Sequence, residues 1–390
     1  MRILWHSVAP WMMSGYGQQT ALFSRALVER GHDVMISSWA GLRGGALPFG
    51  ESIKVVPGST EQGGIAGLDL LVEHATRYQP DAIVILMDAW PLDADVLRHL
   101  PCALWAPVDQ EPIPPAVVSR LLAVDQPLAM SRHGLAQMKK TGCTRAAYVP
   151  HAVSAQVFHP QDRVESRRAW GLSGSAFVAV MAATNDSFPS RKGLDRAIKA
   201  WGRFSLGRDA VLYLHTPPDA SFGGYDLPGL ARLYGVDSAK IRFTEPYRLA
   251  CGGVSPGEIA RLYSAADVLL APSAGEGFCI PMLEAQACGC PVIASDFTAQ
   301  AEMNWAGWKL EVDRFDDMTV TFLGCEQAMV RPSRIVAALE QAWEARGDAA
   351  LRERAIAGAV EYEIEVVAGR MVKVLEGVAG GGAGTSARRA

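Results

Sequence analysis

The chain has 390 residues, which is too long for one ordinary hydrophobic core and predicts about two domains. Hydrophobic residues make up 49% and charged residues 20%, which is normal for a soluble globular protein. The formal net charge of −4 excludes a global basic field that would attract nucleic acid or acidic lipid, although a local basic patch is compatible with it.

The cysteines and the apolar runs indicate where the protein works. Seven cysteines form no even disulfide framework, and the first residues lack the layout of a signal peptide, so a reducing cytoplasm is expected. No apolar run reaches the roughly 18 residues of a membrane span, so any membrane contact should be peripheral. Cys288 and Cys290 form a close pair without partner ligands, which favours small buried residues over a metal site.

Residues 1–150 predict a Rossmann-like α/β domain. It opens with a strand, a glycine turn, a helix that ends before Gly31, and a second strand. The stretch 41–64 is rich in Gly, Pro and Ser and predicts a long connection with one short strand. The expected strands are 2–7, 33–39, 53–56, 82–87, 103–108, 128–131 and 146–149, and the expected helices are 18–30, 68–78 and 133–140.

Asp93 and Asp95 have the Asp-x-Asp spacing of a known metal-binding motif. They follow Pro91 at an expected helix start, where carboxylates cap free N–H groups and favour the helix dipole. We therefore expect capping here and no metal site.

Residues 151–360 are expected to form a second Rossmann-like domain, with the same alternation of strands and helices. Ser255 and Glu258 form a plausible capping box before one of the helices. A helix is expected to run without a break over 349–377, and the glycine-rich tail 379–390 is expected to be disordered. The expected strands are 177–182, 211–215, 242–244, 268–271 and 292–294, and the other expected helices are 194–204, 258–266 and 332–345.

The stretch 268–295 predicts a strand, a glycine turn, a helix and a second strand. Glycines in the turn let the backbone approach a ligand, and the helix N-terminus offers free N–H groups to an anion. Glu276 lies at the loop tip and Glu284 about two turns into the helix, so both can face one cleft. Carboxylates accept hydrogen bonds from sugar or ribose hydroxyls, and the whole arrangement therefore favours a nucleotide sugar as ligand.

This stretch resembles the paired-glutamate signature of retaining glycosyltransferase family four, and the residues that carry the resemblance are Glu276, Gly277, Phe278, Glu284, Ala285, Gly289 and 291–294. The resemblance implies the GT-B fold, an α/β architecture of two Rossmann-like domains whose parallel sheets face an interdomain cleft. It also implies that a C-terminal helix at 361–378 crosses back to the first domain. The first domain then takes the acceptor and the second the donor, most often a UDP-sugar.

The resemblance also implies the roles of single residues. Glu284 would bind ribose hydroxyls, and Glu276 would contact the donor sugar. Arg191 and Lys192 stand at a helix start, where their positive charges oppose the helix dipole and a bound anion would compensate for this. Asp186 occupies the position at which the family usually has an arginine. The remaining donor-side residues are Gly15, Gly17, Gly277, Phe278 and Cys279, with Pro246, Tyr247 and Arg248 near the base.

Asp109 and Glu111 follow the expected strand 103–108, and charged residues at the carboxyl end of a parallel strand lie where ligands bind. Many family members have a histidine here. Asp109 would be catalytic, by accepting a sugar hydroxyl or stabilising positive charge, or it would simply cap the turn into Pro112. Glu111 and Tyr16 are expected on the acceptor side.

The sequence thus predicts a retaining, metal-independent glycosyltransferase that needs no cofactor. Its acceptor would be a glycan, glycolipid or small-molecule hydroxyl. One alternative is a hydroxymethylated pyrimidine in DNA, as in phage-type transferases, which would require a basic track and stacking aromatics. A second alternative is a sugar-nucleotide-binding protein without turnover.

Overall fold

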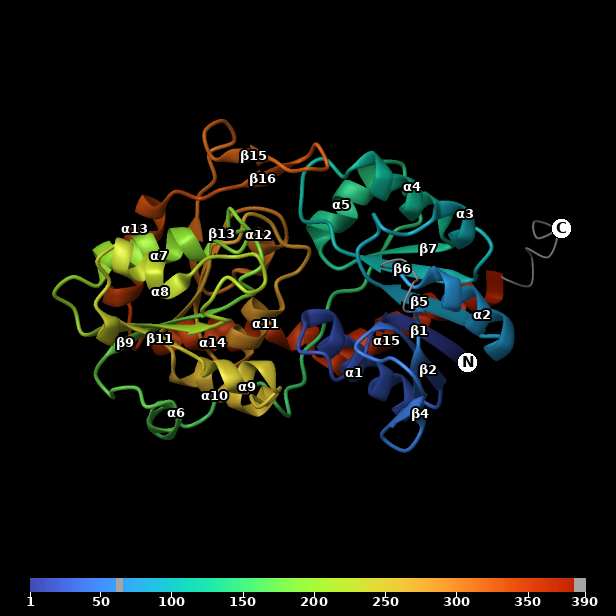
Figure 1. Ribbon diagram of the computed structural model, residues 1–390, viewed down its shortest axis with the longest axis horizontal. Helices are drawn as coiled ribbons and strands as arrows, with labels where there is room; N and C mark the ends of the chain where they lie inside the picture. Colours follow the sequence, from blue (N-terminus) through green and yellow to red (C-terminus); the bar gives the residue numbers. More distant parts are fainter. Residues whose placement is uncertain (61–65, 382–390) are drawn as a thin grey trace. The chain divides into compact units, whose positions relative to one another are not determined.

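The computed structural model describes residues 1–60 and 66–381, which form two α/β units (Figure 1). Unit 1 comprises Met1–Ala152 and the chain from Tyr362 onward, and unit 2 comprises Val153–Glu361. The sequence places these divisions after residues 150 and 360. Both units have the Rossmann-like α/β architecture that the sequence predicts.

Unit 1 contains an eight-stranded sheet with the order β3-β4-β2-β1-β5-β6-β7-β8. Its neighbours pair in parallel except β3, which runs antiparallel to β4 and was not expected from the sequence. Strand order reverses between β1 and β5. The strands are β1 (Arg2–Val8), β2 (Asp33–Ala40), β3 (Leu47–Phe49), β4 (Ile53–Pro57), β5 (Ala82–Leu86), β6 (Cys102–Ala106), β7 (Gln126–Ala129) and β8 (Ala147–Tyr148).

The helices of unit 1 cover its sheet and include the last helix of the chain. They are α1 (Gly15–Glu29), α2 (Leu68–Tyr78), α3 (Ala94–Leu97), α4 (Pro115–Ala123), α5 (Arg132–Lys140) and α15 (Ile364–Gly381). The α15 helix packs against α1, and the Arg30 guanidinium donates to the Glu365 carbonyl at 2.8 Å. Gly31, with φ +80°, follows the C-cap of α1 as expected.

The expected unbroken helix over 349–377 is wrong. The chain forms α14 (Ala349–Ala359), a 3-10 turn η2 (Val360–Tyr362) and then α15. The break falls where the chain leaves unit 2, because Leu351 and Ala355 pack into a unit 2 cluster whereas Met371 is buried in unit 1. The α15 helix continues through Gly381, so the expectation of disorder is also wrong for residues 379–381, and residues 382–390 lie outside the described part.

Unit 2 contains a six-stranded parallel sheet with the order β11-β10-β9-β12-β13-β14, and the order reverses between β9 and β12. A separate antiparallel pair, β15 and β16, joins the unit. The strands are β9 (Phe177–Ala182), β10 (Ala210–His215), β11 (Ile241–Phe243), β12 (Val268–Ala271), β13 (Val292–Ser295), β14 (Gly307–Leu310), β15 (Met318–Val320) and β16 (Glu326–Ala328).

Helices cover both faces of the unit 2 sheet. One core contains Leu212 and Leu214 of β10 with residues of α7 and α13, and Figure 1 shows α7, α8 and α13 on one side and α6 and α10 on the other. The Ser255 and Glu258 capping box at the start of α10 is confirmed. The helices are α6 (Arg163–Ala169), α7 (Leu194–Phe204), α8 (Leu227–Leu233), η1 (Ser238–Lys240), α9 (Pro246–Ala250), α10 (Pro256–Ala265), α11 (Ile280–Ala287), α12 (Ala299–Met303) and α13 (Pro332–Glu344), followed by α14.

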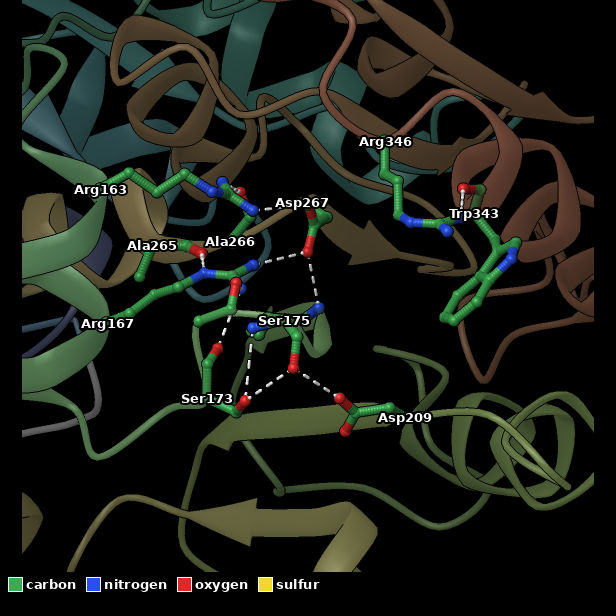
Figure 2. A network of polar contacts seen from close by, with 12 residues as sticks. Arg163, Arg167, Ser173, Ser175, Asp209, Ala265, Ala266, Asp267, Trp343 and Arg346 are labelled. Atoms are coloured by element: carbon green, nitrogen blue, oxygen red, sulfur yellow. Dashed lines mark hydrogen bonds and ion pairs between the residues drawn. The ribbon is translucent and has the colours of Figure 1, made fainter.

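An ion cluster ties helix α6 to the amino ends of β9 and β12. Figure 2 shows the buried Asp267 carboxylate between the guanidinium groups of Arg163 and Arg167. The distances are 2.5 and 2.9 Å, and the Val178 amide donates to the same carboxylate at 2.8 Å. This cluster lies at the edge of the sheet opposite the carboxyl ends of the strands.

Within residues 1–60 and 66–381, we find no helix whose length and hydropathy would allow it to cross a bilayer.

Candidate donor-binding site

The two loops that follow β9 and β12 carry most of the predicted donor-side residues. In open parallel sheets, ligands bind beyond the carboxyl ends of the strands at the point where strand order reverses, and in unit 2 that point lies between β9 and β12. The loop after β9 brings Arg191 and Lys192, and the loop after β12 brings Glu276 and the start of α11. Lys192 and Glu276, 84 residues apart in sequence, thereby become neighbours.

Glu276 forms the centre of a buried ion cluster. Lys192 Nζ donates to its Oε1 at 2.6 Å, and Arg191 Nη1 lies 3.6 Å from its Oε2. Burial alone would raise the pKa of Glu276, but Lys192 and Arg191 outweigh that effect and hold the pKa below its ordinary value. Glu276 is therefore a charged carboxylate at neutral pH, and two cations face it.

The turn that carries Glu276 is fixed by several hydrogen bonds. The Ala274 amide donates to the Arg191 carbonyl at 2.7 Å, and the Glu276 amide donates to Thr298 Oγ1 at 3.0 Å. Gly193 lies between the two loops with φ +75°, and a Cβ atom there would lie 2.4 Å from the Pro272 carbonyl oxygen. This close approach explains why glycine follows Lys192.

Two residues at this site have strained backbones: Cys279 lies in the turn itself, and Thr298, which follows β13, accepts the hydrogen bond from the Glu276 amide. Cys279 has φ +76° and Thr298 has φ +51°, and these are two of the three described non-glycine residues with positive φ, the third being Gln79. Such conformations cost about 1–3 kcal/mol each and cluster at functional sites, where surrounding contacts enforce them. The strain thus supports a functional role for the turn.

Among the residues that the structure describes, no side chain caps the backbone N–H groups at the N-terminus of α11. Cys279 stands at the N-cap and makes no side-chain hydrogen bond to the first turn, and Pro281 is in that turn. The predicted residues Gly277 and Phe278, both buried, lead directly into the helix. A helix start of this kind, next to Arg191 and Lys192, attracts an anionic group such as a diphosphate.

Glu284 lies apart from the ion cluster. It is the fifth residue of α11, so it sits about one turn into the helix and not two as the sequence suggested. The Tyr263 hydroxyl donates to its Oε2 at 3.3 Å, a partner that the sequence did not reveal. Burial raises the pKa of Glu284 to about 8, against a smaller lowering by the Tyr263 hydrogen bond. No cation pairs with it among the contacts of the described residues.

The residues predicted near the base lie just after β11, in α9. Glu245 caps this helix by accepting from the Tyr247 and Arg248 amides. Arg248 pairs with Glu258 at 2.6 Å and donates to the Gly253 carbonyl, whereas the Tyr247 side chain is 73% exposed. Pro246 is in the first turn. Arg248 therefore has structural partners already, and Tyr247 is open to a ligand.

Gly15, Tyr16 and Gly17 lie in unit 1, at the start of α1. The Gly17 amide donates to Ser14 Oγ at 3.1 Å, and a Cβ at Gly17 would lie 2.2 Å from the Met12 carbonyl oxygen. The Tyr16 hydroxyl donates to Asp88 Oδ2 at 3.4 Å, which links the loops after β1 and β5. Close packing thus explains the glycine at position 17.

Asp109 and Glu111 follow β6 in unit 1. Asp109 is half-buried. Glu111 Oε1 accepts from Gln137 Nε2 at 3.2 Å and lies 3.6 Å from His133 Nδ1, so α5 fixes its side chain.

Asp93 caps α3 by accepting from the Asp95 and Val96 amides, and Asp95 pairs with Arg98, so the capping expectation is confirmed. Cys288 and Cys290 are buried and unpaired, as expected. In the part of the chain that the structure describes, no group of three His, Cys, Asp or Glu side chains is arranged to hold a metal ion.

Residues 180–319 match the family model described as Glycosyl transferases group 1, and this stretch lies within unit 2. D-inositol 3-phosphate glycosyltransferase of Actinosynnema mirum is 37% identical over 151 residues, which are 38% of this chain and 34% of that protein. Alpha-galactosylglucosyldiacylglycerol synthase of Streptococcus pneumoniae is 28% identical over 160 residues, 39% of this chain and 38% of that protein. The chain spans about a third of the length of the curated relatives it matches.

Solved structures that match nearly the whole chain confirm the predicted GT-B fold class. Sucrose-phosphate synthase from Thermosynechococcus elongatus superposes with a TM-score of 0.73 at 16% identity, over 97% of this chain and 99% of that one. WaaG, a glycosyltransferase involved in lipopolysaccharide biosynthesis, has a TM-score of 0.69 at 14% identity, over 96% and 99%. Anabaena Alr3699/HepE in complex with UDP and glucose has a TM-score of 0.66 at 12% identity, over 97% and 100%.

Proposed function

We propose, from the match of residues 180–319 to the model described as Glycosyl transferases group 1, that the chain is a glycosyltransferase that takes a sugar from a nucleotide-diphosphate sugar. We propose a UDP-sugar as donor and retention of configuration at the anomeric carbon. HepE, a structural neighbour, was solved with UDP and with UDP-glucose, which supports this choice of donor. A cytoplasmic location is part of the same proposal.

The observation that carries the proposal is the ion cluster at the switch point of unit 2. Two cations, Lys192 and Arg191, face the single carboxylate of Glu276, an arrangement that supports binding of an anion beside them. These cations lie beside the start of α11, whose first turn has no side-chain cap. A diphosphate satisfies both, while Glu276 keeps a carboxylate oxygen for donor-sugar hydroxyls.

In the proposed reaction, the bond between the anomeric carbon and the diphosphate oxygen breaks on the same face on which the acceptor oxygen bonds to that carbon. The acceptor proton passes to the leaving phosphate. Negative charge grows on that phosphate, and Lys192, Arg191 and the α11 N–H groups are fixed where they stabilise it. These groups supply the positive charge that a metal ion would otherwise provide. Asp109 is proposed to accept a hydrogen bond from a sugar hydroxyl.

For the acceptor, we propose a hydroxyl of a glycan, a glycolipid or a small polyol. The similar proteins named above act on inositol 3-phosphate or make a galactosylglucosyl lipid, according to their names. No observation favours DNA as the acceptor. A binding protein without turnover would bind the donor at the same cluster.

A screen of donors tests the proposal. The full chain is mixed with UDP-, GDP- and ADP-sugars, and both the melting temperature and the release of free nucleotide are measured. We expect stabilisation by one class of donor and slow hydrolysis without acceptor. Binding without any release of nucleotide, with or without a panel of polyol and glycolipid acceptors, would favour the binding protein. No stabilisation by any nucleotide sugar would overturn the proposal.

A further inference from the structure

A short chain of hydrogen bonds lies at the carboxyl ends of β10 and β11. His215 Nδ1 lies 2.9 Å from Thr244 Oγ1, and the Thr244 hydroxyl donates to the Tyr213 hydroxyl oxygen at 3.3 Å. Tyr213 and His215 belong to β10, and Thr244 follows β11 directly. The predicted base residues begin two positions after Thr244.

This chain of bonds fixes the position of the ring proton on His215. Because the single hydroxyl proton of Thr244 goes to Tyr213, its oxygen must accept from His215 Nδ1. Burial lowers the pKa of His215 to about 4, so the ring is neutral at physiological pH and carries one proton. Nε2 is then left with a lone pair, and it makes no hydrogen bond within the described residues.

His215 and Glu284 lie on the same face of the unit 2 sheet. Leu212 and Leu214 point into the core with α7 and α13, so Tyr213 and His215, which alternate with them, point to the other face. The ring contact of 5.3 Å between Tyr213 and Trp170, the C-cap of α6, agrees with this direction. That face also carries α10, whose Tyr263 contacts Glu284.

The strands that lead to the two side chains are close together, since His215 ends β10 and Glu284 lies in α11, the helix that follows β12. β10 and β12 are separated by β9 alone, which corresponds to two strand spacings, or about 10 Å. A nucleoside spans a gap of this kind when its ribose hydroxyls meet Glu284 and the edge of its base meets His215. Both groups lie at the carboxyl edge, where the sheet binds ligands.

We propose that His215 Nε2 accepts a hydrogen bond from a ring N–H of the donor's nucleobase, and so selects the base. Uracil offers N3–H and guanine offers N1–H at this edge, whereas cytosine N3 and adenine N1 are acceptors and would face a second lone pair. His215 is therefore a specificity residue for uridine or guanosine nucleotides. The inference rests on the proposed donor site.

The test measures the affinity of the full chain for UDP, GDP, CDP and ADP by calorimetry. Wild-type protein is expected to bind UDP or GDP at least tenfold more tightly than CDP and ADP, because an unpaired polar group at such a site costs far more than a bond gained. His215→Phe keeps the ring but removes the lone pair, and it should weaken the preferred nucleotide and erase the preference. His215→Gln, whose amide offers a donor and an acceptor, should bind all four with similar affinity.

Two controls separate this inference from the donor site as a whole. Lys192→Ala should weaken all four nucleotides to a similar degree, since it contacts the diphosphate. His159→Phe, an exposed histidine of unit 2, should leave all affinities unchanged. Equal binding of the four bases by wild type, or a preference that survives in His215→Phe with an unchanged melting temperature, would overturn the inference while the donor site stands. Failure of all four nucleotides to bind would overturn both.

Discussion

The two units have the same strand order but differ in the groups that lie where this order reverses. Read from one side, β4-β2-β1-β5-β6-β7 in unit 1 has the same order as β11-β10-β9-β12-β13-β14 in unit 2. At the switch point of unit 1, Ser14 caps α1 by accepting from the Gly17 amide. At the switch point of unit 2, Cys279 leaves the start of α11 without a side-chain cap.

The charged groups beside the starts of α1 and α11 also differ. Unit 2 places Lys192 and Arg191 beside its uncapped helix, whereas unit 1 places the Tyr16 hydroxyl and the Asp88 carboxylate there. Free N–H groups and cations favour an anion, while a capped helix beside a carboxylate favours neutral hydroxyl groups. This contrast agrees with the proposal that unit 2 binds the diphosphate of the donor and that unit 1 takes a hydroxyl-bearing acceptor.

The largest expected effect concerns the ion cluster around Asp267, which, like the cluster around Glu276, has one carboxylate and two cations. Asp267 has two arginine partners, as Glu276 has two cations, but it lies at the amino ends of the strands. Asp267→Ala leaves the buried Arg167 and the half-buried Arg163 without their carboxylate and should lower the free energy of unfolding by about 3–5 kcal/mol. Chemical denaturation measures this, and Asp95→Ala at an exposed pair is the matched control with little expected change.

Turnover at low temperature should survive Asp267→Ala in the molecules that remain folded. A loss of turnover beyond the loss of folded protein would mean that the two clusters are not separate in role.

Lys192→Ala should have the next largest effect. Loss of one preorganised donor at a leaving group lowers kcat by about 10²–10³-fold. Lys199→Ala, on the exposed side of α7, is the control and should leave kcat unchanged. Steady-state kinetics with the preferred donor decides, and a change confined to KM would show that Lys192 binds the ground state only.

How far the sequence predicted these features depends on whether their cause is local. The apolar runs of β9 and β12 and the periodic pattern of α2 and α7 gave those elements with the residue bounds observed. Glu276 and Lys192 were identified because glycines and a helix start surround them in sequence. Their ion pair, across 84 residues, required the fold.

Other features had no local signal. Tyr263 lies in an ordinary amphipathic helix, and Thr298 is a β-branched residue at a backbone angle that favours glycine, so neither pattern indicated a site. The break at Val360–Tyr362 arises because two cores compete for one helical stretch. Tertiary packing decides such cases and is not visible in periodicity.

Glu284 should give a pH effect of intermediate size. Its pKa is about 8 in the folded protein and near the ordinary 4.5 when unfolded, so between these values the folded state binds the extra proton. The free energy of unfolding should therefore fall as pH rises from 5 to 8, and Glu284→Gln should remove that part of the slope. Denaturation curves of both proteins at several pH values give the difference.

Donor binding should reverse this dependence. Ribose hydroxyls donate to a charged carboxylate, so the bound state lowers the pKa of Glu284 and releases a proton, and affinity should rise with pH up to about 8. Calorimetry of UDP binding in buffers of different ionisation enthalpy measures the number of protons released on binding. Glu284→Gln should bind about tenfold more weakly with no proton released; equal affinity and equal release in both proteins would remove Glu284 from the ribose site.

The smallest expected effect tests the strain at Cys279. Glycine relieves about 1–2 kcal/mol of steric cost in a left-handed conformation, but it adds about 0.4–1 kcal/mol of chain entropy to the unfolded state. Cys279→Gly should therefore change the free energy of unfolding by less than about 1 kcal/mol, yet lower turnover several-fold because the turn before α11 is less firmly held. Gln79→Gly is the matched control: it also has positive φ, but it lies at the exposed end of α2 in unit 1, so its stability change should be similar and its turnover normal. If Cys279→Gly also left turnover unchanged, the strained turn would be a property of packing, and the contrast between the two switch points would then rest on charge and capping alone.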